Sequence, residues 1–496
     1  MMYNSYMNIY LTGHDYKYAV EQMLLTLYPQ ERPVYPAERL PGDSVSITLR
    51  KNAKYAVAAC RLTTNGAVSA GSARYLLSRA PETQDAVRME QRIVKLAFYR
   101  AALRAGHEKP VWGSLTGVRP AKFFNGLIQR DHLSPAQAER ELATVHGVDP
   151  DRAALCARAA KAAREVRDSL APEDVCLYIG IPYCPTRCAY CSFVSVDAPR
   201  LLKTIQAYLD ALEREIAATA QAAARSGRRV VAVYIGGGTP TTLSAEELDR
   251  LLGMLRASFD LSACREFTVE AGRPDTVTAE KLAVLAKHGT DRVSVNPQTM
   301  SDAVLAAIGR RHTVQQVEEA VAMVKAQGGL ALNMDLIAGL PGDTPESFAA
   351  TLDAVLRLGP ENVTVHTLAL KKGSKFLTEG AALPSGEAVG AMLRSAGEKL
   401  TAAGFEPYYL YRQKFMSGSF ENVGWTLPGF RNVYNVCIME ELCSIIAMGA
   451  GGSTKLIAPG GVVKRLMAPK YTREYMERIA DTCKAKETLP LFFGYD

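Results

Sequence analysis

Three cysteines stand close together in the segment GIPYCPTRCAYCSF. They are Cys184, Cys188 and Cys191, which gives the spacing C-x3-C-x2-C. Three thiolates on one short loop can hold three corners of a 4Fe-4S cube and leave the fourth iron without a protein ligand. A structural zinc ion needs four closed ligands instead, and no fourth Cys or His stands within this loop. The spacing therefore predicts one 4Fe-4S cluster with one open iron.

An open iron in such a cluster has a chemical use. It can chelate the amino and carboxylate groups of S-adenosylmethionine (SAM), and an electron from the cluster can then cleave the sulfonium to give a 5'-deoxyadenosyl radical. No acidic or basic side chain supplies chemistry of this kind, so no residue is assigned a catalytic role. Tyr190, between the second and third cysteines, is interpreted as a lid packed over the cluster, with an ordinary core aromatic as the alternative.

A repeating pattern of strand and helix begins near residue 172 and must position the cysteine loop. Each unit has a short β-branched or aromatic run followed by a helical stretch, and the unit recurs six times. Alternation of this kind builds a parallel sheet with helices outside it, so the pattern predicts a partial (β/α)6 barrel, an incomplete form of the eight-unit barrel. The predicted strands are 175–181, 230–235, 266–270, 292–296, 331–337 and 362–368, and the predicted helices are 202–224, 245–259, 279–288, 314–327, 345–358 and 387–403.

Small and polar residues stand at the carboxyl ends of these strands, the face where barrel enzymes place their sites. Gly236, Gly237 and Gly238 end the second strand, where missing Cβ atoms let the backbone approach a ligand, although such a triplet also suits a simple turn. Glu270 ends the third strand and would aim a carboxylate into the same mouth, as an acceptor for ribose hydroxyls or an ammonium group. Taken alone, a strand-end Glu is more often a solvated charge at the rim.

Two further regions flank the barrel, so we expect an N-terminal α+β accessory domain at 1–170, the barrel at 171–403 and a C-terminal region at 404–496. In the first region, SVSITLR and KYAVAACRL alternate as the strands of a hairpin do. The last region is irregular and rich in Tyr, Phe and Gly, with a glycine cluster MGAGGST, and it is interpreted as a substrate-covering region. Helices in the first region are predicted at 82–105, 134–146 and 150–170.

The segment VWGSLTGVRPAK, at 111–122, lies between the predicted helices of the first region and ends in two cations. It could bind an anion, or it could be a solvated loop. The sequence leaves both interpretations open.

Composition narrows the classes of function. The formal net charge of +7 is modest for 496 residues, which argues against a nucleic-acid partner and leaves room for an anionic small substrate. Ten cysteines, three of them packed together, are typical of a metal site with bystanders rather than of a disulfide framework. No apolar run is long enough for a membrane span and the first residues do not resemble a secretory signal. We therefore expect a cytoplasmic monomer without a membrane partner.

The cysteine loop resembles that of radical SAM enzymes, and further motifs narrow the resemblance. YIGIPYC, GGGTPTTL, VNPQTM, MDLIAGLPGDT and VHTLALKKGS together are similar to the oxygen-independent coproporphyrinogen III oxidases. Within that branch the chain resembles the HemZ-type coproporphyrinogen dehydrogenases. The resemblance covers roughly residues 172 to 460, and the region before it resembles the extra domain that such proteins carry.

The resemblance implies that one or two SAM molecules bind at the barrel mouth beside the cluster. It assigns Tyr178 and Gly237 to the SAM that is cleaved. It assigns a neighbouring pocket for a second ligand to Gly238, Thr239, Gln298, Arg310, Asp335 and Ala369.

The resemblance also implies a reaction, the oxidative decarboxylation of coproporphyrinogen III propionates to vinyl groups, which gives protoporphyrinogen IX in haem biosynthesis. Its partners would be the tetrapyrrole and an electron donor such as flavodoxin or ferredoxin. Two positions depart from the pattern: Phe193 stands where well-known members have a further cysteine, and Gly180 where many have histidine. Relatives without that cysteine include haem chaperones, so a haem-binding chaperone and a radical SAM enzyme acting on another tetrapyrrole are the alternatives.

The remaining candidate ligands have plainer interpretations. Cys437 and Cys443 are too sparse to bind a second cluster and are predicted to be buried thiols. His312 and His366 are interpreted as structural residues, with haem ligation or proton transfer as the alternative. No metal-like spacing relates the other cysteines, which are Cys60, Cys156, Cys176, Cys264 and Cys483.

Overall fold

The computed structural model describes residues 5–80, 82–191, 196–197, 203–370, 376, 382–413, 417–458 and 462–494. The chain divides into two compact units, Met1–Ala157 and Arg158–Asp496. None of the helices in the described part of the chain combines the length and the apolar character needed to cross a bilayer.

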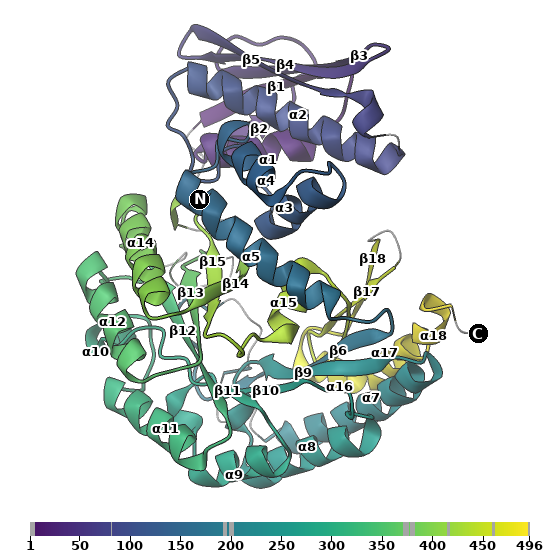
Figure 1. Ribbon diagram of the computed structural model, residues 1–496, viewed down its shortest axis with the longest axis vertical. Coiled ribbons are helices and arrows are strands. Elements are labelled where there is room, and N and C mark those ends of the chain that lie inside the picture. The colour runs from purple at the N-terminus through teal and green to yellow at the C-terminus, as the bar shows by residue number, and fades with distance from the viewer. Residues whose placement is uncertain are drawn as a thin grey trace. The chain divides into compact units, whose positions relative to one another are not determined.

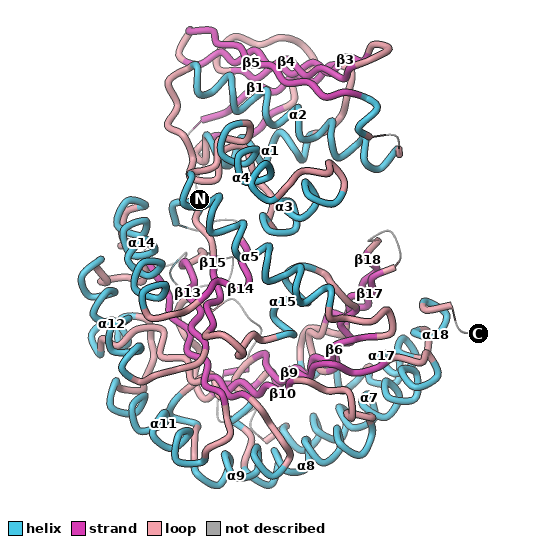
Figure 2. Tube along the Cα trace, in the orientation of Figure 1, coloured by secondary structure: helices cyan, strands magenta, loops and turns pink. Residues whose placement is uncertain are grey.

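The N-terminal unit is an α+β structure built on a five-stranded sheet with the order β2-β1-β3-β4-β5 (Figure 2). The strand β1 pairs in parallel with β2 and β3, and the predicted hairpin is confirmed as the antiparallel pair of β3 and β4. The elements are β1 (Ser5–Thr12), α1 (Lys17–Leu27), β2 (Glu31–Val34), β3 (Ser44–Lys51), β4 (Tyr55–Thr64), β5 (Ala67–Leu76), η1 (Leu77–Arg79), α2 (Thr83–Arg104), α3 (Pro120–Gln129) and α4 (Pro135–Thr144).

Helix α2 supplies much of the core of this unit. Val94, Ala97 and Phe98 lie on one face of the helix, as the 3.6-residue period requires, and are fully buried in the same cluster as Val45 and Ile47 of the sheet. The helix α3 was not predicted. The loop that precedes it ends at Arg119. Pro120 suits the first helical position, because proline lacks the N–H that this position leaves unused.

The second unit holds one 11-stranded sheet in which the six predicted barrel strands are consecutive neighbours, in the order β6-β9-β10-β11-β12-β13. Every pairing among them is parallel. The helices that connect them lie on the outer side of the curved sheet (Figure 1). The partial (β/α)6 barrel is therefore confirmed, and no pairing in the described part of the chain closes the sheet into a complete barrel.

The bounds of the barrel elements follow the predicted pattern to within a few residues. Helix α5 (Pro150–Asp168) precedes them. The elements are β6 (Asp174–Ile181), β7 (Tyr183–Cys184), β8 (Val196–Asp197), α7 (Ile205–Arg225), β9 (Arg229–Gly237), η2 (Pro240–Thr242), α8 (Ala245–Ser258), β10 (Glu266–Glu270), η3 (Pro274–Thr276), α9 (Ala279–Lys287), β11 (Arg292–Ser294), α10 (Asp302–Ala307), α11 (Val314–Gln327), β12 (Ala331–Ala338), α12 (Pro345–Arg357), β13 (Asn362–Thr367) and α14 (Gly386–Ala402).

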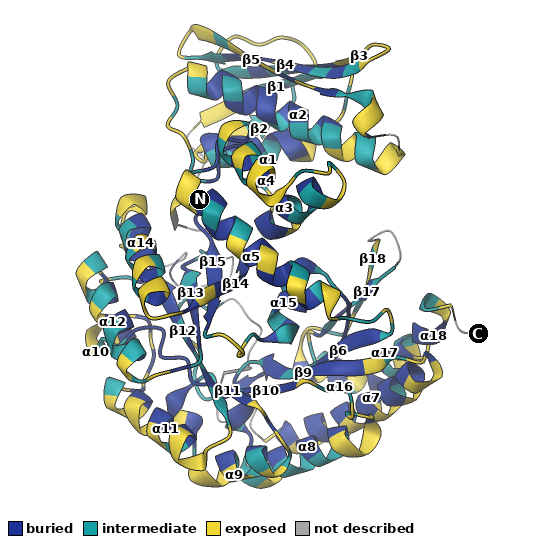
Figure 3. Cartoon of the chain, in the orientation of Figure 1, coloured by how far each residue is buried: buried dark blue, intermediate teal, exposed yellow. Residues whose placement is uncertain are grey.

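Local chemistry explains why the helices begin where they do. Capping boxes start α8 at Ser244, α11 at Thr313 and α12 at Thr344, where each side chain accepts a hydrogen bond from the third helical N–H. The strands between the helices are buried on both faces, which is why they read as nearly continuous apolar runs (Figure 3). Exposed residues gather on the outer faces of the helices in the same view.

The residues after 404 are more regular than the sequence analysis expected. Antiparallel β15 and β14 extend the sheet beyond β13, and β16 joins its other edge in parallel with β6. Because some of these strands run antiparallel to their neighbours, strand and helix do not alternate here. Without that alternation, the sequence did not predict the strands. The elements are β14 (Glu406–Tyr411), η4 (Ser417–Ser419), β15 (Asn422–Thr426), α15 (Val433–Glu440), β16 (Ser444–Met448), β17 (Ser453–Ile457), β18 (Val463–Met467), α16 (Thr472–Glu477), α17 (Ile479–Lys486) and α18 (Leu489–Phe492).

Candidate active site at the barrel mouth

A cavity of about 560 Å³ opens at the carboxyl ends of the barrel strands. Every residue that the sequence analysis proposes for the cluster or for SAM lines it, although these residues are spread along nearly two hundred positions of the chain. They are Tyr178, Cys184, Cys188, Tyr190, Cys191, Gly237, Gly238, Thr239, Glu270, Gln298, Arg310, Asp335 and Ala369.

The three cysteines form part of the cavity wall. Cys184 ends the short strand β7, where its sulfur accepts a hydrogen bond from the Thr239 hydroxyl at 3.5 Å. The backbone N–H of Cys191 donates to the carbonyl of Cys188 at 3.1 Å, which curls the loop so that both thiols reach the cavity. All three side chains are partly exposed and none forms a disulfide. Three accessible soft donors on one loop fit the ligand set of a 4Fe-4S cluster.

The glycine triplet allows the cysteine loop to lie against β9. Gly237 has a φ of +112°, a conformation that other residues rarely adopt. A Cβ at Gly238 would lie 2.5 Å from the carbonyl oxygen of Tyr183 and 2.9 Å from that of Ile181. Only glycine therefore lets the strand that carries Cys184 approach this closely.

Arg310 and Tyr190 form a buried polar pair beside the cysteine loop. The guanidinium donates to the Asn296 carbonyl at 2.7 Å and to the Tyr190 hydroxyl at 3.2 Å. Burial raises the pKa of Tyr190, so the phenol stays protonated. The Nε of Arg310 is buried without a hydrogen-bond partner in the described structure. An unsatisfied cationic donor in the cavity wall fits an anionic ligand such as the carboxylate of SAM.

Glu270 meets a group of aromatic rings across the cavity. Its carboxylate accepts a hydrogen bond from the Tyr234 hydroxyl, and burial raises its pKa to about 7. The Tyr234 ring stacks on Tyr178 and Tyr434, with centroids 6.4 and 4.5 Å away. Glu270 is thus poised to change protonation state near neutral pH when a ligand arrives.

Asp335, on β12, is kept ionised by its hydrogen-bonding neighbours. Asn333 donates to it at 2.8 Å and the His366 Nε2 lies 3.6 Å away. Although burial alone would raise its pKa, these neighbours hold the pKa of Asp335 below its usual value. Gln298 has a φ of +70° and pairs with Leu336 through an isolated bridge, which fixes it beside Asp335. Two polar residues from neighbouring strands therefore face one region of the cavity.

Comparison with known proteins agrees with this geometry. The Radical SAM superfamily matches residues 178–355. The oxygen-independent coproporphyrinogen-III oxidase-like protein HemZ of Bacillus subtilis is 39% identical, over 74% of each chain. The chain belongs to the radical SAM superfamily, in its oxygen-independent coproporphyrinogen III oxidase branch. Family membership implies a 4Fe-4S cluster and SAM, and the donors described above fit both.

Two further proteins are similar to this chain. The heme chaperone HemW of Escherichia coli is 29% identical over 61% of this chain and 75% of its own length. The solved structure of the coproporphyrinogen III oxidase HemN from Escherichia coli superimposes with a TM-score of 0.51 at 24% identity, covering 65% of this chain and 72% of that chain. This likeness shows that the two proteins share the radical SAM fold.

Residues 404–496 were predicted to cover the substrate, but none of their side chains was assigned to the cavity in advance. Tyr409, Tyr411 and Gln413 follow one another at the two-residue period of a strand face, a signal that the composition of the segment obscured. His366, which the sequence analysis took as structural, also lines the cavity. Further lining residues from this region are Asn422, Tyr434, Asn435, Ile438 and Met439.

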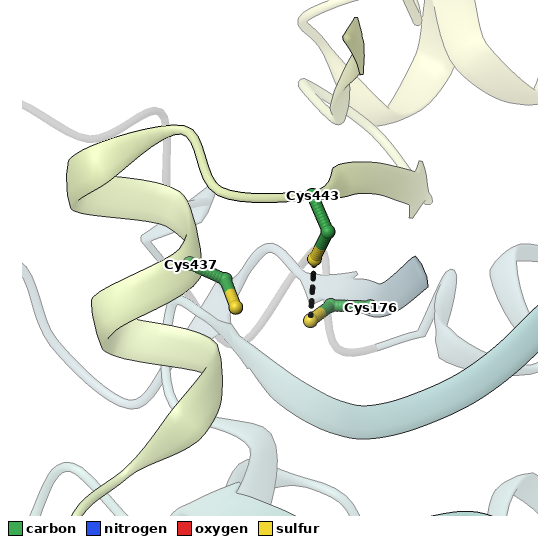
Figure 4. A group of neighbouring side chains, drawn as sticks. All are labelled: Cys176, Cys437 and Cys443. Carbon is green, nitrogen blue, oxygen red and sulfur yellow. Dashed lines mark hydrogen bonds between the residues drawn. The ribbon is translucent and has the colours of Figure 1, made fainter. Parts of the chain in front are cut away.

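A second group of thiols (Figure 4) lies in the same buried cluster as Tyr408, Tyr409 and Tyr434. The sulfur atoms of Cys176, Cys437 and Cys443 all lie within 4.8 Å of one another, and those of Cys176 and Cys443 are 3.6 Å apart. The sequence placed these cysteines far apart and gave no reason to group them. All three are buried, as was predicted for Cys437 and Cys443, and none lines the cavity that holds the cysteine loop. This buried trio is therefore separate from the radical SAM site.

Proposed function

We propose that the protein catalyses the oxygen-independent oxidative decarboxylation of coproporphyrinogen III propionates to vinyl groups, giving protoporphyrinogen IX. One observation carries the proposal: three accessible thiols and the polar strand ends surround a single cavity of about 560 Å³, in a chain that is 39% identical to HemZ. A volume of this size lies within the range of about 300–1,000 Å³ typical of small-molecule sites.

Cys184, Cys188 and Cys191 would hold the 4Fe-4S cluster and leave one iron for SAM. When bound, the cluster and SAM supply a 5'-deoxyadenosyl radical, which can remove a hydrogen atom from an unactivated C–H bond. Removal of that hydrogen from the β-carbon of a propionate, with loss of CO2 and of one electron to an acceptor, leaves a vinyl group. The reductant for the cluster would be a cytoplasmic protein of the flavodoxin or ferredoxin class.

The chain's own residues would bind and orient SAM. Gly237 lets the ligand approach the backbone, and Glu270 can accept hydrogen bonds from an ammonium group or from ribose hydroxyls. The unsatisfied Nε of Arg310 can donate to a carboxylate. Asp335 and Gln298 would act in the same way on a second SAM, beside Ala369.

Residues from the C-terminal region would cover the tetrapyrrole. Tyr409, Tyr411, Ile438 and Met439 give this part of the cavity an aromatic and apolar wall. Such a wall suits a macrocycle and limits the access of water to a reactive centre. This supports the proposal that residues 404–496 form a substrate-covering region.

The test is an anaerobic assay with reconstituted cluster, SAM, a reductant and coproporphyrinogen III labelled with deuterium at the propionate β-carbons. We expect successive losses of CO2 with two hydrogens through a mono-vinyl intermediate, and we expect deuterium to enter 5'-deoxyadenosine. The Cys184→Ala variant is the control and should form neither product. A tetrapyrrole that gains mass instead would identify a different radical SAM reaction.

A haem-delivery protein is the second candidate. Relatives named heme chaperone HemW support it, as does Phe193 at the position of a further cysteine in the oxidases. Phe193 lies outside the described residues, so its surroundings give no argument. Stoichiometric haem binding without any vinyl product from coproporphyrinogen III would favour this candidate over the oxidase.

A further inference from the structure

A second cavity, of about 250 Å³, lies within the N-terminal unit and is lined by cations. It is formed by α2, by the loop before α3, by the first turn of α3 and by His146 (the helices are labelled in Figure 1). No carboxylate is among the described residues that line it. The cationic lining residues are Arg88, Arg92, Lys95, Arg119 and Arg130.

Lys95 is the clearest sign that this cavity lacks a negative charge. Its ammonium group donates to the Thr116 hydroxyl at 3.2 Å, and it makes no ion pair in the described structure. Burial and the nearby Arg92 lower its pKa to about 8. A bound anion would offset both effects, because its negative charge would stabilise the ammonium group of Lys95 against burial and against the nearby Arg92.

The arginines around Lys95 are oriented by contacts with neighbouring side chains, one of which, Phe123, also lines the cavity. Arg130 and Arg88 share Asp85, at 3.2 and 3.3 Å. Arg92 lies over the Phe123 ring with its guanidinium carbon 4.5 Å from the centroid, and Asp131 is 3.8 Å away. These contacts hold guanidinium groups at the cavity wall before any ligand arrives, which reduces the entropy that a ligand must overcome.

His146 adds a neutral polar side chain to the lining of the cavity. It is 1% exposed, its Nδ1 lies 3.0 Å from the Ser114 hydroxyl, and its Nε2 has no hydrogen-bond partner in the described structure. Burial and three neighbouring cations lower its pKa to about 3, so the ring is neutral. The Ser114 hydroxyl has one proton and can donate it to the His146 carbonyl, 3.2 Å away, or to Nδ1; in the second arrangement the ring proton lies on Nε2 and can be donated to an oxygen in the cavity.

We propose that this cavity binds the phosphate or diphosphate group of a small phosphorylated molecule. Guanidinium groups match the tetrahedral oxygens of phosphate in pairs, and several cations around one space favour a multiply charged oxyanion over a single carboxylate. The positive end of α3, which has no side-chain cap, adds to the attraction. The volume corresponds to roughly eight water molecules at about 30 Å³ each, so the space is larger than one phosphate group needs. This inference does not depend on the proposed function.

The test is titration calorimetry on the full chain, without SAM, using inorganic pyrophosphate as the probe. We expect saturable binding, and we expect Lys95→Met and Arg119→Gln each to weaken it at least about tenfold because each removes a cation from the lining. Lys109→Met is the matched control, since it removes the same charge from an exposed position outside the cavity. Its affinity should equal that of the wild type.

Three results would overturn the proposal. The first is the absence of saturable heat with pyrophosphate, and the second is an equal loss of affinity in Lys109→Met. The third is binding to a single-stranded oligonucleotide but not to pyrophosphate, which would mean that the cations serve a polynucleotide. Circular dichroism confirms the fold of each variant, and if Lys95→Met does not fold, Arg119→Gln alone decides the outcome.

Discussion

Cys184, Cys188 and Cys191 share their chemistry with seven other cysteines, and only their surroundings set them apart. They are partly exposed on the wall of the barrel cavity, whereas Cys176 and Cys437 are fully buried. A metal ligand must be reachable, deprotonated and close to the other ligands. Among the cysteines, only those of the loop line the cavity that the candidate SAM-binding residues also line, so only they can be reached from it.

Replacing any cysteine of the loop should therefore remove the cluster. Cys184→Ala, Cys188→Ala and Cys191→Ala should each lose most of the bound iron and the brown 4Fe-4S absorbance after anaerobic reconstitution. Cys437→Ala is the control, because its thiol lies in the buried trio, and it should keep near-normal iron. Equal iron loss in Cys437→Ala would show that the trio holds the metal instead.

Glu270 should make the stability of the protein depend on pH. Its pKa is raised from 4.5 in a flexible chain to about 7 in the folded protein, so folding favours the protonated acid. Its contribution is therefore fully present below pH 4.5 and is lost as the pH rises to about 7. Relative to Glu270→Gln, which cannot ionise, the ligand-free wild type should lose up to about 3 kcal/mol of unfolding free energy over this range.

Urea unfolding of both proteins between about pH 4 and pH 8 measures this difference. Glu318→Gln, at an exposed position on α11, is the control and should run parallel to the wild type. If the wild type and Glu270→Gln also run parallel, the carboxyl group is not buried in the way the structure describes.

At the scale of elements, the cysteine loop depends on one glycine. A Cβ at Gly238 would meet the carbonyl oxygens of Ile181, at the end of β6, and Tyr183, at the start of β7, and backbone cannot move aside as a side chain can. Gly238→Ala should therefore shift β7 and lower the iron content at least several-fold. Gly253→Ala is the matched control on α8, where the nearest atom would be 3.9 Å away. It should keep its iron and gain about 0.5–1 kcal/mol of stability, because alanine favours a helix.

The helices and strands were predictable where the regular alternation of strand and helix continued. The strand β10 was expected at Glu266–Glu270 and the helix α11 at Val314–Gln327, and the structure has both at those bounds. Both follow from local rules, a short β-branched run and a capping box. The strands β15 and β16 were not predicted, because β15 pairs with β13 and β16 with β6, and no local pattern encodes such distant pairing; β14, which pairs with β15, was missed with them. The helix α3 was missed because its first residues belong to the glycine-containing segment 111–122, which was interpreted as a loop.

The candidate site was likewise predictable where its residues stand on the repeating strand-helix units. Residues at the carboxyl ends of parallel strands meet at one edge whatever their separation in the sequence, so Glu270, the last residue of its strand, could be placed at the mouth by this rule. Asp335 lies within β12, and only the family resemblance assigned it to the site. Tyr411 and Met439 reach the cavity from elements outside the repeating units. The proximity of Cys176 to Cys443 likewise depends on the pairing of β6 with β16, which no spacing in the sequence reveals.

At the scale of the whole molecule, the chain holds two compact units, each with a cavity of its own. One core cluster of the N-terminal unit is built from residues between Met7 and Ala102, and one of the second unit from residues between Ala162 and Ile445. Every described residue that lines the smaller cavity belongs to the first unit, and every one that lines the larger cavity belongs to the second. Ligands of the two cavities should therefore stabilise different segments.

Hydrogen exchange of the cluster-loaded full chain can separate the two effects. SAM should slow exchange at the strand ends and the cysteine loop, in residues 178–191, 234–239 and 364–369, because a ligand reduces the local opening of the backbone it contacts. Pyrophosphate should slow exchange in residues 114–123 instead. At a ligand concentration a hundred times Kd, each effect can reach about 2.7 kcal/mol, or roughly a hundredfold in rate. Protection of 114–123 by SAM, or of the strand ends by pyrophosphate, would contradict the assignment of one ligand to each unit, because no described lining residue of either cavity belongs to the other unit.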